Sequence, residues 1–333
     1  MRNKFILIIL CFMLSILYVG CSYTYINTET EEELNSIIEK TENDITSLQF
    51  YLIDDTTTLK TFQNDYSIIL ELETITFDDL NEDYILIPYS IKKNNVLLKQ
   101  GTSKLSFTNN ARGGLILSFD DYYECWDNYL QYFKDYNVKA TFFCKGYRHQ
   151  IINFCKNAVN LGLEVGYHTQ DHKALSLITE EDDLYTQAIN PLKQYKQEYI
   201  FFDSFACPNG AYSPWQISIL LQYYKVVRLF DNKFRLCSLS DLGKERVVWS
   251  QSIDRNKFLD DEDFKNRITR RFLASIITDK VYLCTTHYFL TTPEEIDNHD
   301  YTISKDNLIW LLELVNIMNL PNYCFNEIYN YIY

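Results

Sequence analysis

The chain has 333 residues, of which 47% are hydrophobic, and its formal net charge is -14 at pH 7. This length suits one barrel-sized domain with an extension, and the hydrophobic fraction suffices for a large core. Because an acidic surface repels nucleic-acid backbones and anionic lipids, the charge argues against both as ligands and leaves neutral or cationic substrates. No feature of the sequence predicts a protein partner.

The first 20 residues have the pattern of an export signal. Arg2 and Lys4 precede the apolar stretch 5–18, and small residues lead to Cys21. This pattern resembles a bacterial lipoprotein signal, which implies that Cys21 is lipidated and that residues 1–20 are removed. An uncleaved anchor is the alternative, although the stretch is short for a transmembrane helix. Both interpretations predict a location at the bacterial cell envelope, and the first predicts a membrane-anchored lipoprotein that is periplasmic or surface-exposed.

Two different patterns follow the signal. Residues 21–49 are polar and acidic with apolar residues loosely at helical spacing, which predicts a tether followed by one helix. Residues 50–111 contain short β-type runs separated by turn clusters, and they predict a small β-rich accessory region. The runs in this region are 67–72, 84–91, 95–98 and 103–107.

Strands and helices alternate over residues 112–333. The predicted strands are 114–119, 138–144, 163–167, 199–207, 225–229, 246–251, 280–286 and 322–325. The predicted helices are 124–136, 150–161, 180–197, 214–223, 261–278 and 304–318. Repeated strand–helix units predict an α/β fold with a parallel sheet covered by helices, and this many units favour a distorted or incomplete (β/α) barrel.

Candidate catalytic side chains follow the ends of the predicted strands, where (β/α) barrels carry their chemistry. Asp120 and Asp121 come directly after the first strand, His168 and His172 follow the third, and His287 follows the seventh. One carboxylate and two imidazoles suit a divalent cation with positions left open for water and substrate. Because side chains alternate across a strand, one aspartate can bind the metal while its neighbour stays free as a base. The sequence therefore predicts a metal-assisted hydrolase.

Five motifs occur in the order seen in polysaccharide deacetylases, the metal-dependent enzymes of carbohydrate esterase family four. These motifs are Ser118–Asp121, Lys139–Phe143, His168–His172, Phe205–Gly210 and Leu283–His287. The chain resembles this family over about residues 113–325. The resemblance implies a distorted (β/α) barrel, a divalent metal ion that is usually zinc, and removal of N- or O-acetyl groups from glycans.

The resemblance also implies a role for each matching residue. The implied metal ligands are Asp121, His168 and His172. The implied general base is Asp120 and the implied general acid is His287. The implied oxyanion loop, which would donate a backbone N–H, consists of Pro208, Asn209 and Gly210.

Four positions depart from the family pattern. Tyr122 replaces the usual glycine after the paired aspartates and could crowd the site or stack on a sugar. Asn209 stands where the family has tyrosine, and Ala206 where many members have an arginine that orients the base. Tyr288 replaces an aspartate that often follows the last histidine. These changes remove no catalytic atom, but they affect the tuning of the catalytic groups and the fit of the substrate.

Several residues also permit simpler interpretations. Residues 76–79 repeat the letters of the first motif, but they lie among turn residues and are assigned to a surface turn. Taken alone, Asp120 and Asp121 fit an ordinary strand-end turn, and His168 and His172 fit an exposed loop pair. Cys207 has no histidine near it in sequence, so we interpret it as a buried residue and not as a nucleophile.

The leading hypothesis is an envelope-anchored enzyme that removes acetyl groups from an N-acetylated glycan, either peptidoglycan or an exported polysaccharide. A catalytically impaired, glycan-binding lipoprotein on the same fold is the alternative. Retention of all five candidate catalytic and metal-binding residues favours catalysis, whereas Tyr122, Ala206 and Asn209 favour the binding protein. A third possibility is that the same site hydrolyses acetyl esters or a non-sugar amide.

Overall fold

The computed structural model describes residues 28–53, 57–81, 83–107, 113–290 and 300–329. The predicted signal sequence and Cys21 lie outside these residues. The chain forms two units, one up to Thr41 and one from Glu42 to Tyr333. All described residues of the first unit belong to helix α2 (Thr28–Asn43). Within the described ranges, no helix combines the length and the apolar character that crossing a bilayer requires.

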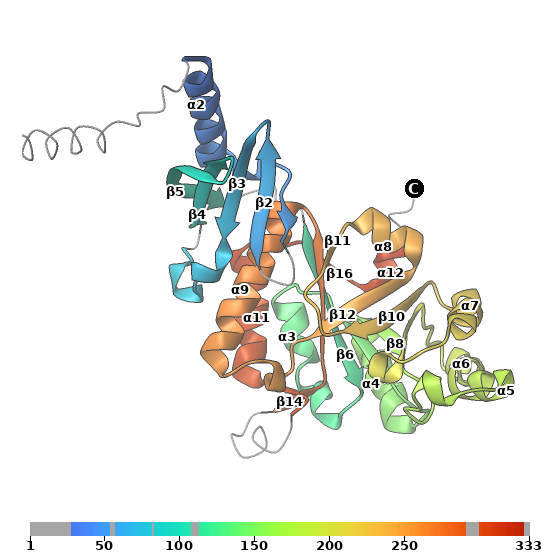
Figure 1. Ribbon diagram of the computed structural model, residues 1–333. Helices are drawn as coiled ribbons and strands as arrows, with labels where there is room; N and C mark the ends of the chain where they lie inside the picture. Colours follow the sequence, from blue (N-terminus) through green and yellow to red (C-terminus); the bar gives the residue numbers. More distant parts are fainter. Residues whose placement is uncertain (1–27, 54–56, 82, 108–112, 291–299, 330–333) are drawn as a thin grey trace, which may run out of the picture. The chain divides into compact units, whose positions relative to one another are not determined.

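The second unit begins with a five-stranded antiparallel sheet, which confirms the predicted β-rich region (Figure 1). Its strands, in spatial order, are β1 (Tyr51–Leu52), β2 (Thr58–Gln63), β3 (Tyr66–Glu71), β4 (Tyr84–Lys93) and β5 (Val96–Ser106). The predicted runs 95–98 and 103–107 are one continuous strand. Gly101 between them pairs with Tyr89, and a Cβ at this glycine would lie 2.7 Å from the Tyr89 hydroxyl. The glycine therefore serves close packing and does not form a turn.

A short segment after β3 joins this sheet to the rest of the unit. Residues 76–79 form a 3₁₀ turn, η3 (Phe77–Asp79), which is closed by a capping box between Thr76 and Asp79. Phe77 N donates to Asn266 Oδ1 at 2.9 Å, and Arg270 Nε donates to Ile75 O at 2.6 Å. These residues are therefore structural, as predicted.

Seven parallel strands close into the predicted barrel. They are β6 (Gly114–Asp121), β7 (Thr141–Cys144), β8 (Glu164–Tyr167), β9 (Ser204–Ala206), β10 (Val226–Asp231), β12 (Val247–Ser252) and β13 (Val281–Thr286). The last strand pairs with the first from Val281–Gly114 to Thr286–Phe119. Closure is uneven, because β8 and β9 share only the pair Tyr167–Phe205. The barrel is therefore distorted, as the sequence predicts.

Short strands extend this sheet and form a small second one. They are β11 (Leu236–Cys237), antiparallel to β13, β16 (Asn322–Tyr323), parallel to β6, and the parallel pair β14 (Tyr288–Leu290) and β15 (Thr302–Ser304). Strand β16 pairs with Leu115 and Ile116 of β6. On the same edge of β6, strand β7 pairs with the residues from Ser118 to Asp121. The first and last parts of the barrel sequence are therefore neighbours in the sheet.

Helices lie outside the strands, as Figure 1 shows. They are α3 (Leu130–Asp135), α4 (His149–Asn160), α5 (Glu181–Leu184), α6 (Pro191–Gln197), α7 (Pro214–Tyr223), α8 (Leu239–Glu245), α9 (Asp261–Thr278), α11 (Lys305–Ile317) and α12 (Phe325–Ile328). The predicted helices 150–161, 214–223, 261–278 and 304–318 match α4, α7, α9 and α11 to within one residue at each end.

Two predicted helices are interrupted. Helix 124–136 begins as a 3₁₀ turn, η4 (Glu124–Asn128), in which the buried Trp126 donates from Nε1 to His287 O at 2.7 Å. Helix 180–197 contains a π-helical segment, Tyr185–Ile189, which ends two residues before Pro191. A proline ring clashes with the carbonyl four residues earlier, and the wider π turn avoids this clash.

Three predicted strands are shorter than expected. Strand 138–144 begins only at Thr141, strand 199–207 covers only Ser204–Ala206, and strand 322–325 ends at Tyr323. In the last case, Cys324 N donates a hydrogen bond to Glu327 Oε2 at 2.8 Å, and this cap starts α12. Apolar runs alone do not reveal such local caps.

Candidate active site

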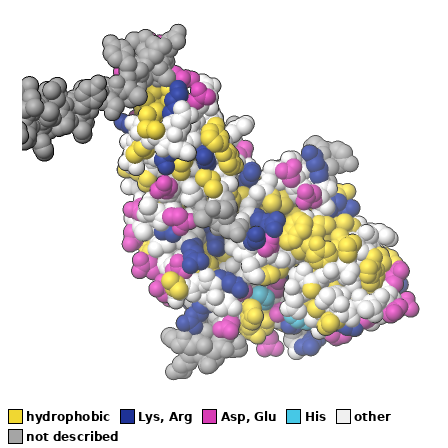
Figure 2. All heavy atoms as spheres, viewed as in Figure 1, with side chains coloured by type: hydrophobic (Ala, Val, Ile, Leu, Met, Phe, Trp, Pro, Cys, Tyr) yellow, Lys and Arg dark blue, Asp and Glu magenta, His cyan; other side chains and the backbone are white. Residues whose placement is uncertain are grey.

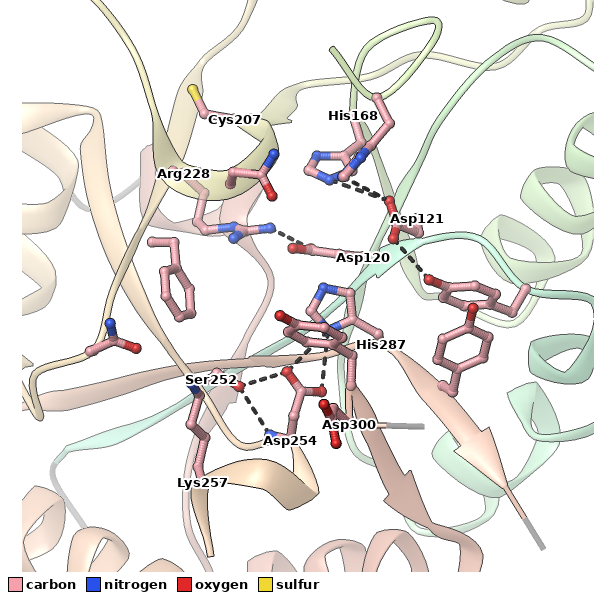
Figure 3. A pocket seen from close by; sticks show the side chains of 18 residues that line it. Asp120, Asp121, His168, Cys207, Arg228, Ser252, Asp254, Lys257, His287 and Asp300 are labelled. Atoms are coloured by element: carbon pink, nitrogen blue, oxygen red, sulfur yellow. Dashed lines mark hydrogen bonds and ion pairs between the residues drawn. The ribbon is translucent and has the colours of Figure 1, made fainter. Parts of the chain in front are cut away.

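The predicted metal ligands converge at one end of the barrel (Figure 3). Asp121 is the last residue of β6, and His168 follows β8 directly. The Nε2 atom of His168 lies 3.6 Å from Asp121 Oδ1, and the Nε2 atom of His172 lies 3.2 Å from the same oxygen. Parallel strands bring these residues together because their carboxyl ends share one edge of the sheet.

These separations fit a divalent cation. Two ligands that are each about 2.1 Å from a tetrahedral zinc ion lie about 3.4 Å from one another. Asp121 Oδ1 is buried and makes no hydrogen bond with the described residues, although Lys145 Nζ lies 3.2 Å away. His168 Nδ1 lies 2.8 Å from the Ala206 carbonyl oxygen, and donation there leaves the Nε2 lone pair for a metal.

The two histidines are neutral, as metal ligands must be. Burial lowers the pKa of His168 to about 4, against the opposing charges of Asp120 and Asp121. Burial also lowers the pKa of His172. Burial raises the pKa of Asp121, but its interactions with His168, His172 and Lys145 outweigh burial, so the pKa lies well below its ordinary value and Asp121 is ionised. The set thus offers one anionic oxygen and two nitrogen lone pairs.

The neighbouring aspartate belongs to a different cluster. Asp120 is 4% exposed and forms an ion pair with Nη2 of Arg228, which is 1% exposed and lies on β10. Burial raises the pKa of Asp120, but Arg228 and the histidines His168 and His287 outweigh it, so the pKa lies below its ordinary value. Asp120 is therefore an ionised carboxylate held in one orientation.

Arg228 is a site residue that motif reasoning missed. It is the register partner of Ala206, which occupies the position where many deacetylases have an arginine. The guanidinium is therefore supplied by β10 and not by β9. A signal was present in the sequence, because an arginine inside the apolar run Val226–Phe230 is buried only when it is paired.

His287 is held by a second residue that the motifs did not indicate. Its Nδ1 lies 3.1 Å and 3.2 Å from the two carboxylate oxygens of Asp254. Asp254 is buried and also accepts hydrogen bonds from Ser252 Oγ at 2.6 Å and Thr286 Oγ1 at 2.7 Å. Asp254 follows the end of the barrel strand β12, and this position was the available signal.

Asp254 keeps His287 protonated. Burial lowers the pKa of His287, but the charge and hydrogen bond of Asp254 outweigh burial and raise the pKa to about 9, with further support from Asp120 and Asp121. In Figure 3, His287 lies between the carboxylates of Asp120 and Asp254. The site thus contains an ionised carboxylate, Asp120, and a protonated imidazole, His287, at the ends of neighbouring strands.

The predicted oxyanion loop is a 3₁₀ turn, η7 (Pro208–Gly210), directly after β9. Asn209 and Gly210 have φ values of 56° and 64°, in the left-handed region that both residue types tolerate. Pro208 has no N–H, and Gly210 N donates to Cys207 O at 3.0 Å. Asn209 is therefore the residue of this loop whose backbone N–H is left to face a ligand.

A cavity of about 650 Å³ connects these groups. Its lining includes the residues Asp120, Asp121, His168, His172, Asn209, Gly210, Arg228, Asp254 and His287. Pro208 is buried and does not line the cavity. Cys207 lines the cavity, but burial raises its pKa to about 12, so it is a thiol and not a nucleophilic thiolate.

The aromatic departures from the family pattern have different positions. Tyr122 has a φ of 71° and packs against Trp126 and Phe154, with ring centroids 6.0 Å and 5.2 Å away. It does not line the cavity, so it neither crowds the site nor offers a surface for a sugar. Tyr288, the other aromatic departure, lines the cavity. Its neighbour Tyr123 also lines the cavity and donates to Asp121 Oδ2 at 2.8 Å.

Solved structures of several deacetylases and esterases are similar to this chain. The Bc1960 peptidoglycan N-acetylglucosamine deacetylase has 17% identity and a TM-score of 0.46, with 65% of this chain and 88% of that chain covered. The chitin deacetylase from the fungal pathogen Colletotrichum lindemuthianum has 15% identity and a TM-score of 0.45, with the same coverage of 65% and 88%. A family 4 acetyl xylan esterase from Clostridium thermocellum has 18% identity and a TM-score of 0.36, with 62% and 92% covered.

Sequence comparison gives a narrower result. No curated protein sequence matches the chain. Residues 108–222 match the family model described as polysaccharide deacetylase. This segment contains Asp120, Asp121, His168, His172 and the loop 208–210. The chain is therefore similar to polysaccharide deacetylases over residues 108–222.

Proposed function

We propose that the protein is a metal-dependent hydrolase that removes acetyl groups from an N-acetylated glycan, either peptidoglycan or an exported polysaccharide. The observation that carries this proposal is the convergence of Asp121, His168 and His172 beside a second, ionised aspartate and a protonated histidine. The family match over residues 108–222 supports the same reaction class.

The residues divide the reaction between them. Asp121, His168 and His172 would hold the cation, for which we propose zinc. When bound, the cation supplies Lewis-acid polarisation of the acetyl carbonyl and a water molecule of lowered pKa. Asp120, oriented by Arg228, accepts the proton of the attacking water as general base.

Two further groups, Asn209 and His287, act on the tetrahedral intermediate and on the departing amine. The backbone N–H of Asn209 donates to the oxygen that becomes negative when the acetyl carbon becomes tetrahedral. His287, protonated through its contact with Asp254, donates its proton to the departing amine. Base and acid thus have opposite protonation states at neutral pH, which acetyl transfer to water requires.

The location belongs to the proposal as well. We place the protein at the bacterial cell envelope with Cys21 as the site of lipid attachment, on the sequence pattern of residues 1–21 alone. The acetylated glycans named above are polymers of that compartment. Globomycin treatment tests this part: accumulation of an unprocessed precursor is expected, and normal processing of the chain would contradict the lipoprotein proposal.

The test of the reaction is acetate release from chito-oligosaccharides, peptidoglycan and acetylated xylan, with and without a chelator. We expect release to stop with the chelator and to return with zinc. His168→Ala should lower turnover by a factor on the order of 10²–10⁴, whereas His149→Ala, which changes an exposed histidine on α4, should not.

The alternative, a glycan-binding lipoprotein without turnover, predicts a different result. Such a protein would bind zinc and a glycan but release no acetate from any acetylated substrate, and that outcome would overturn the enzymatic proposal. Faster release from acetylated xylan than from chito-oligosaccharides would instead favour acetyl esters as the substrates of the same site.

A further inference from the structure

Arginine side chains line a second cavity, of about 150 Å³, which is here called the arginine cavity. Arg267, Arg270 and Arg271 belong to helix α9, and their spacing of three and four residues places them on one face of this helix. Thr57, which precedes β2, and Glu73, which follows β3, line the cavity from the antiparallel sheet. None of the described residues lines both this cavity and the catalytic one.

The arginine cavity lies toward the amino ends of the barrel strands, whereas the catalytic groups lie at the carboxyl ends. Arg271 Nη1 donates to the Tyr282 hydroxyl at 3.0 Å, and Tyr282 is the second residue of β13. His287 follows the other end of the same strand, five residues later, which corresponds to about 17 Å along the strand. A ligand in the arginine cavity would therefore occupy a site of its own.

The charges around the arginine cavity do not balance. Arg267 Nε donates to Asp263 Oδ1 at 2.8 Å. Arg270 Nη1 donates to Glu73 Oε2 at 3.2 Å. Arg271 is only 9% exposed, and it forms no ion pair with a carboxylate of the described residues. Because burying a charge is costly unless the charge is paired, this guanidinium favours an anion beside it.

Aromatic rings hold the Arg271 guanidinium in place. Its Cζ lies 5.6 Å from the ring centroid of Phe234 and 5.7 Å from those of Phe258 and Tyr282. Cation–π contacts of this kind do not use the N–H groups, which point outward in the plane of the guanidinium. Within the described part of the chain, the side chain makes one hydrogen bond, through Nη1. Its Nε and Nη2 groups are therefore fixed donors that are left for a ligand.

Glu73 is the anion that the chain itself supplies, and it is directed to Arg270. Thr57 N and Thr57 Oγ1 donate to Glu73 Oε1 at 3.0 Å and 2.6 Å, so Oε2 is left for Arg270. Burial raises the pKa of Glu73, but these hydrogen bonds and the charges of Arg270 and Arg267 outweigh burial, so the pKa lies below its ordinary value. The ionised Glu73 therefore neutralises Arg270 and leaves the charge of Arg271 uncompensated.

The surroundings of the arginine cavity admit an anion from solution. The side chain of Arg267 is 42% exposed, so the cavity reaches the surface. Figure 2 shows Lys and Arg side chains (dark blue) between the antiparallel sheet and the groove in which histidine side chains (cyan) are visible. The net charge of -14 does not exclude an anion here, because salt screens exposed charges that are more than about 10 Å away.

We propose that the arginine cavity binds one phosphate group, either of free phosphate or of a phosphodiester in an anionic polymer. Guanidinium groups donate paired hydrogen bonds that match phosphate oxygens, and the single charge of a phosphodiester balances the excess cation. The volume of about 150 Å³ is several times the roughly 30 Å³ that a water molecule occupies in the liquid, so a tetrahedral oxyanion has room. This site is additional to the proposed reaction and does not depend on it, and its ligand would join α9 to the antiparallel sheet.

Isothermal titration calorimetry of the zinc-loaded full chain tests this site with two probes at constant ionic strength, inorganic phosphate and a short phosphodiester of glycerol. One equivalent should bind per chain, and the probe with the lower Kd identifies the source of the phosphate group. Arg267→Gln and Arg271→Met should each raise the Kd by at least about tenfold. Arg267→Gln, at a half-exposed position, keeps the test valid if the buried substitution prevents folding.

Lys156→Gln is the matched control, because it removes the same charge from an exposed side chain that is paired with a carboxylate, Glu198. It should leave the Kd unchanged. His168→Ala removes a proposed metal ligand and should also retain phosphate binding, whereas loss of binding in this variant would place the phosphate at the metal and overturn the inference. Equal weakening in Lys156→Gln, no saturable binding of either probe, or acetate that binds as tightly as phosphate would overturn it as well.

Discussion

Replacing Arg228 by alanine removes the cation that pairs with the proposed base, Asp120. Arg228 is 1% exposed, pairs through Nη2 with Asp120, and places its guanidinium 5.1 Å from the ring centroid of Phe143. Without it, the buried Asp120 carboxylate loses its counter-ion. Burial then dominates and raises the pKa of Asp120, which in the native protein lies below its ordinary value.

Two magnitudes follow from this geometry. Removing one partner of a buried ion pair costs about 3–5 kcal/mol of the free energy of unfolding, because the remaining charge stays buried. A base that is protonated near neutral pH should cost a factor on the order of 10²–10⁴ in kcat/KM. The acidic limb of the pH–rate profile should also move to higher pH, because Asp120 must lose a proton before it can act.

The neighbouring strand offers a rescue. Ala206 and Arg228 are register partners on adjacent strands, which lie about 4.8 Å apart. In the double variant Ala206→Arg/Arg228→Ala, the guanidinium should reach Asp120 from β9, recover at least about tenfold in kcat/KM and return the acidic limb toward that of the wild type.

The assays are acetate release as a function of pH and urea unfolding of each variant. Arg246→Ala is the control, because this arginine donates to the backbone carbonyls of Lys225, Leu221 and Tyr224 and pairs with no carboxylate among the described residues. It should lose stability without moving the acidic limb. If Arg228→Ala turned over normally with an unchanged limb, Arg228 would have no role in orienting the base.

Two other predictions concern titration. In the metal-free protein, His287 should titrate near pH 9 by NMR. The variant Asp254→Asn should lower this pKa, and the alkaline limb of the pH–activity profile should then move to lower pH. An unchanged His287 pKa in this variant would contradict the pairing of His287 with Asp254. Burial raises the pKa of Glu164 to about 7 despite its hydrogen bonds, so the free energy of unfolding should fall by an amount on the order of 3 kcal/mol as the pH rises from about 4.5 through 7. Glu164→Gln should remove this loss in urea unfolding, whereas Glu198→Gln, at an exposed position paired with Lys156, should retain it.

The barrel could be predicted because short stretches of sequence are enough to indicate its strands and helices. The barrel strands from Gly114 onward are short apolar runs with helical patterns between several of them, and the strand ends place Asp121 and His168 at one edge without further information. The same reasoning accounts for the length of α9, whose acidic first turn and apolar face are visible in the sequence.

The pairing of Arg228 with Asp120 could not be predicted in this way. The two residues are 108 positions apart, and their contact depends on the register between β9 and β10. A shift of one residue would turn Arg228 out of the barrel, because side chains alternate across a strand. Tyr122 illustrates the same limit, since its direction follows from a backbone φ of 71° that a tyrosine seldom adopts.

The placement of β16 has a consequence for the order of assembly during synthesis. Strand β6, which ends in the two aspartates, has one edge against β13 and the start of its other edge against Asn322 and Tyr323. During synthesis, β13 emerges about 160 residues and Asn322 about 200 residues after the end of β6, so both edges of β6 lack these partners while the contiguous antiparallel sheet is already complete. Chaperone dependence and sensitivity to truncation should therefore concentrate in the barrel.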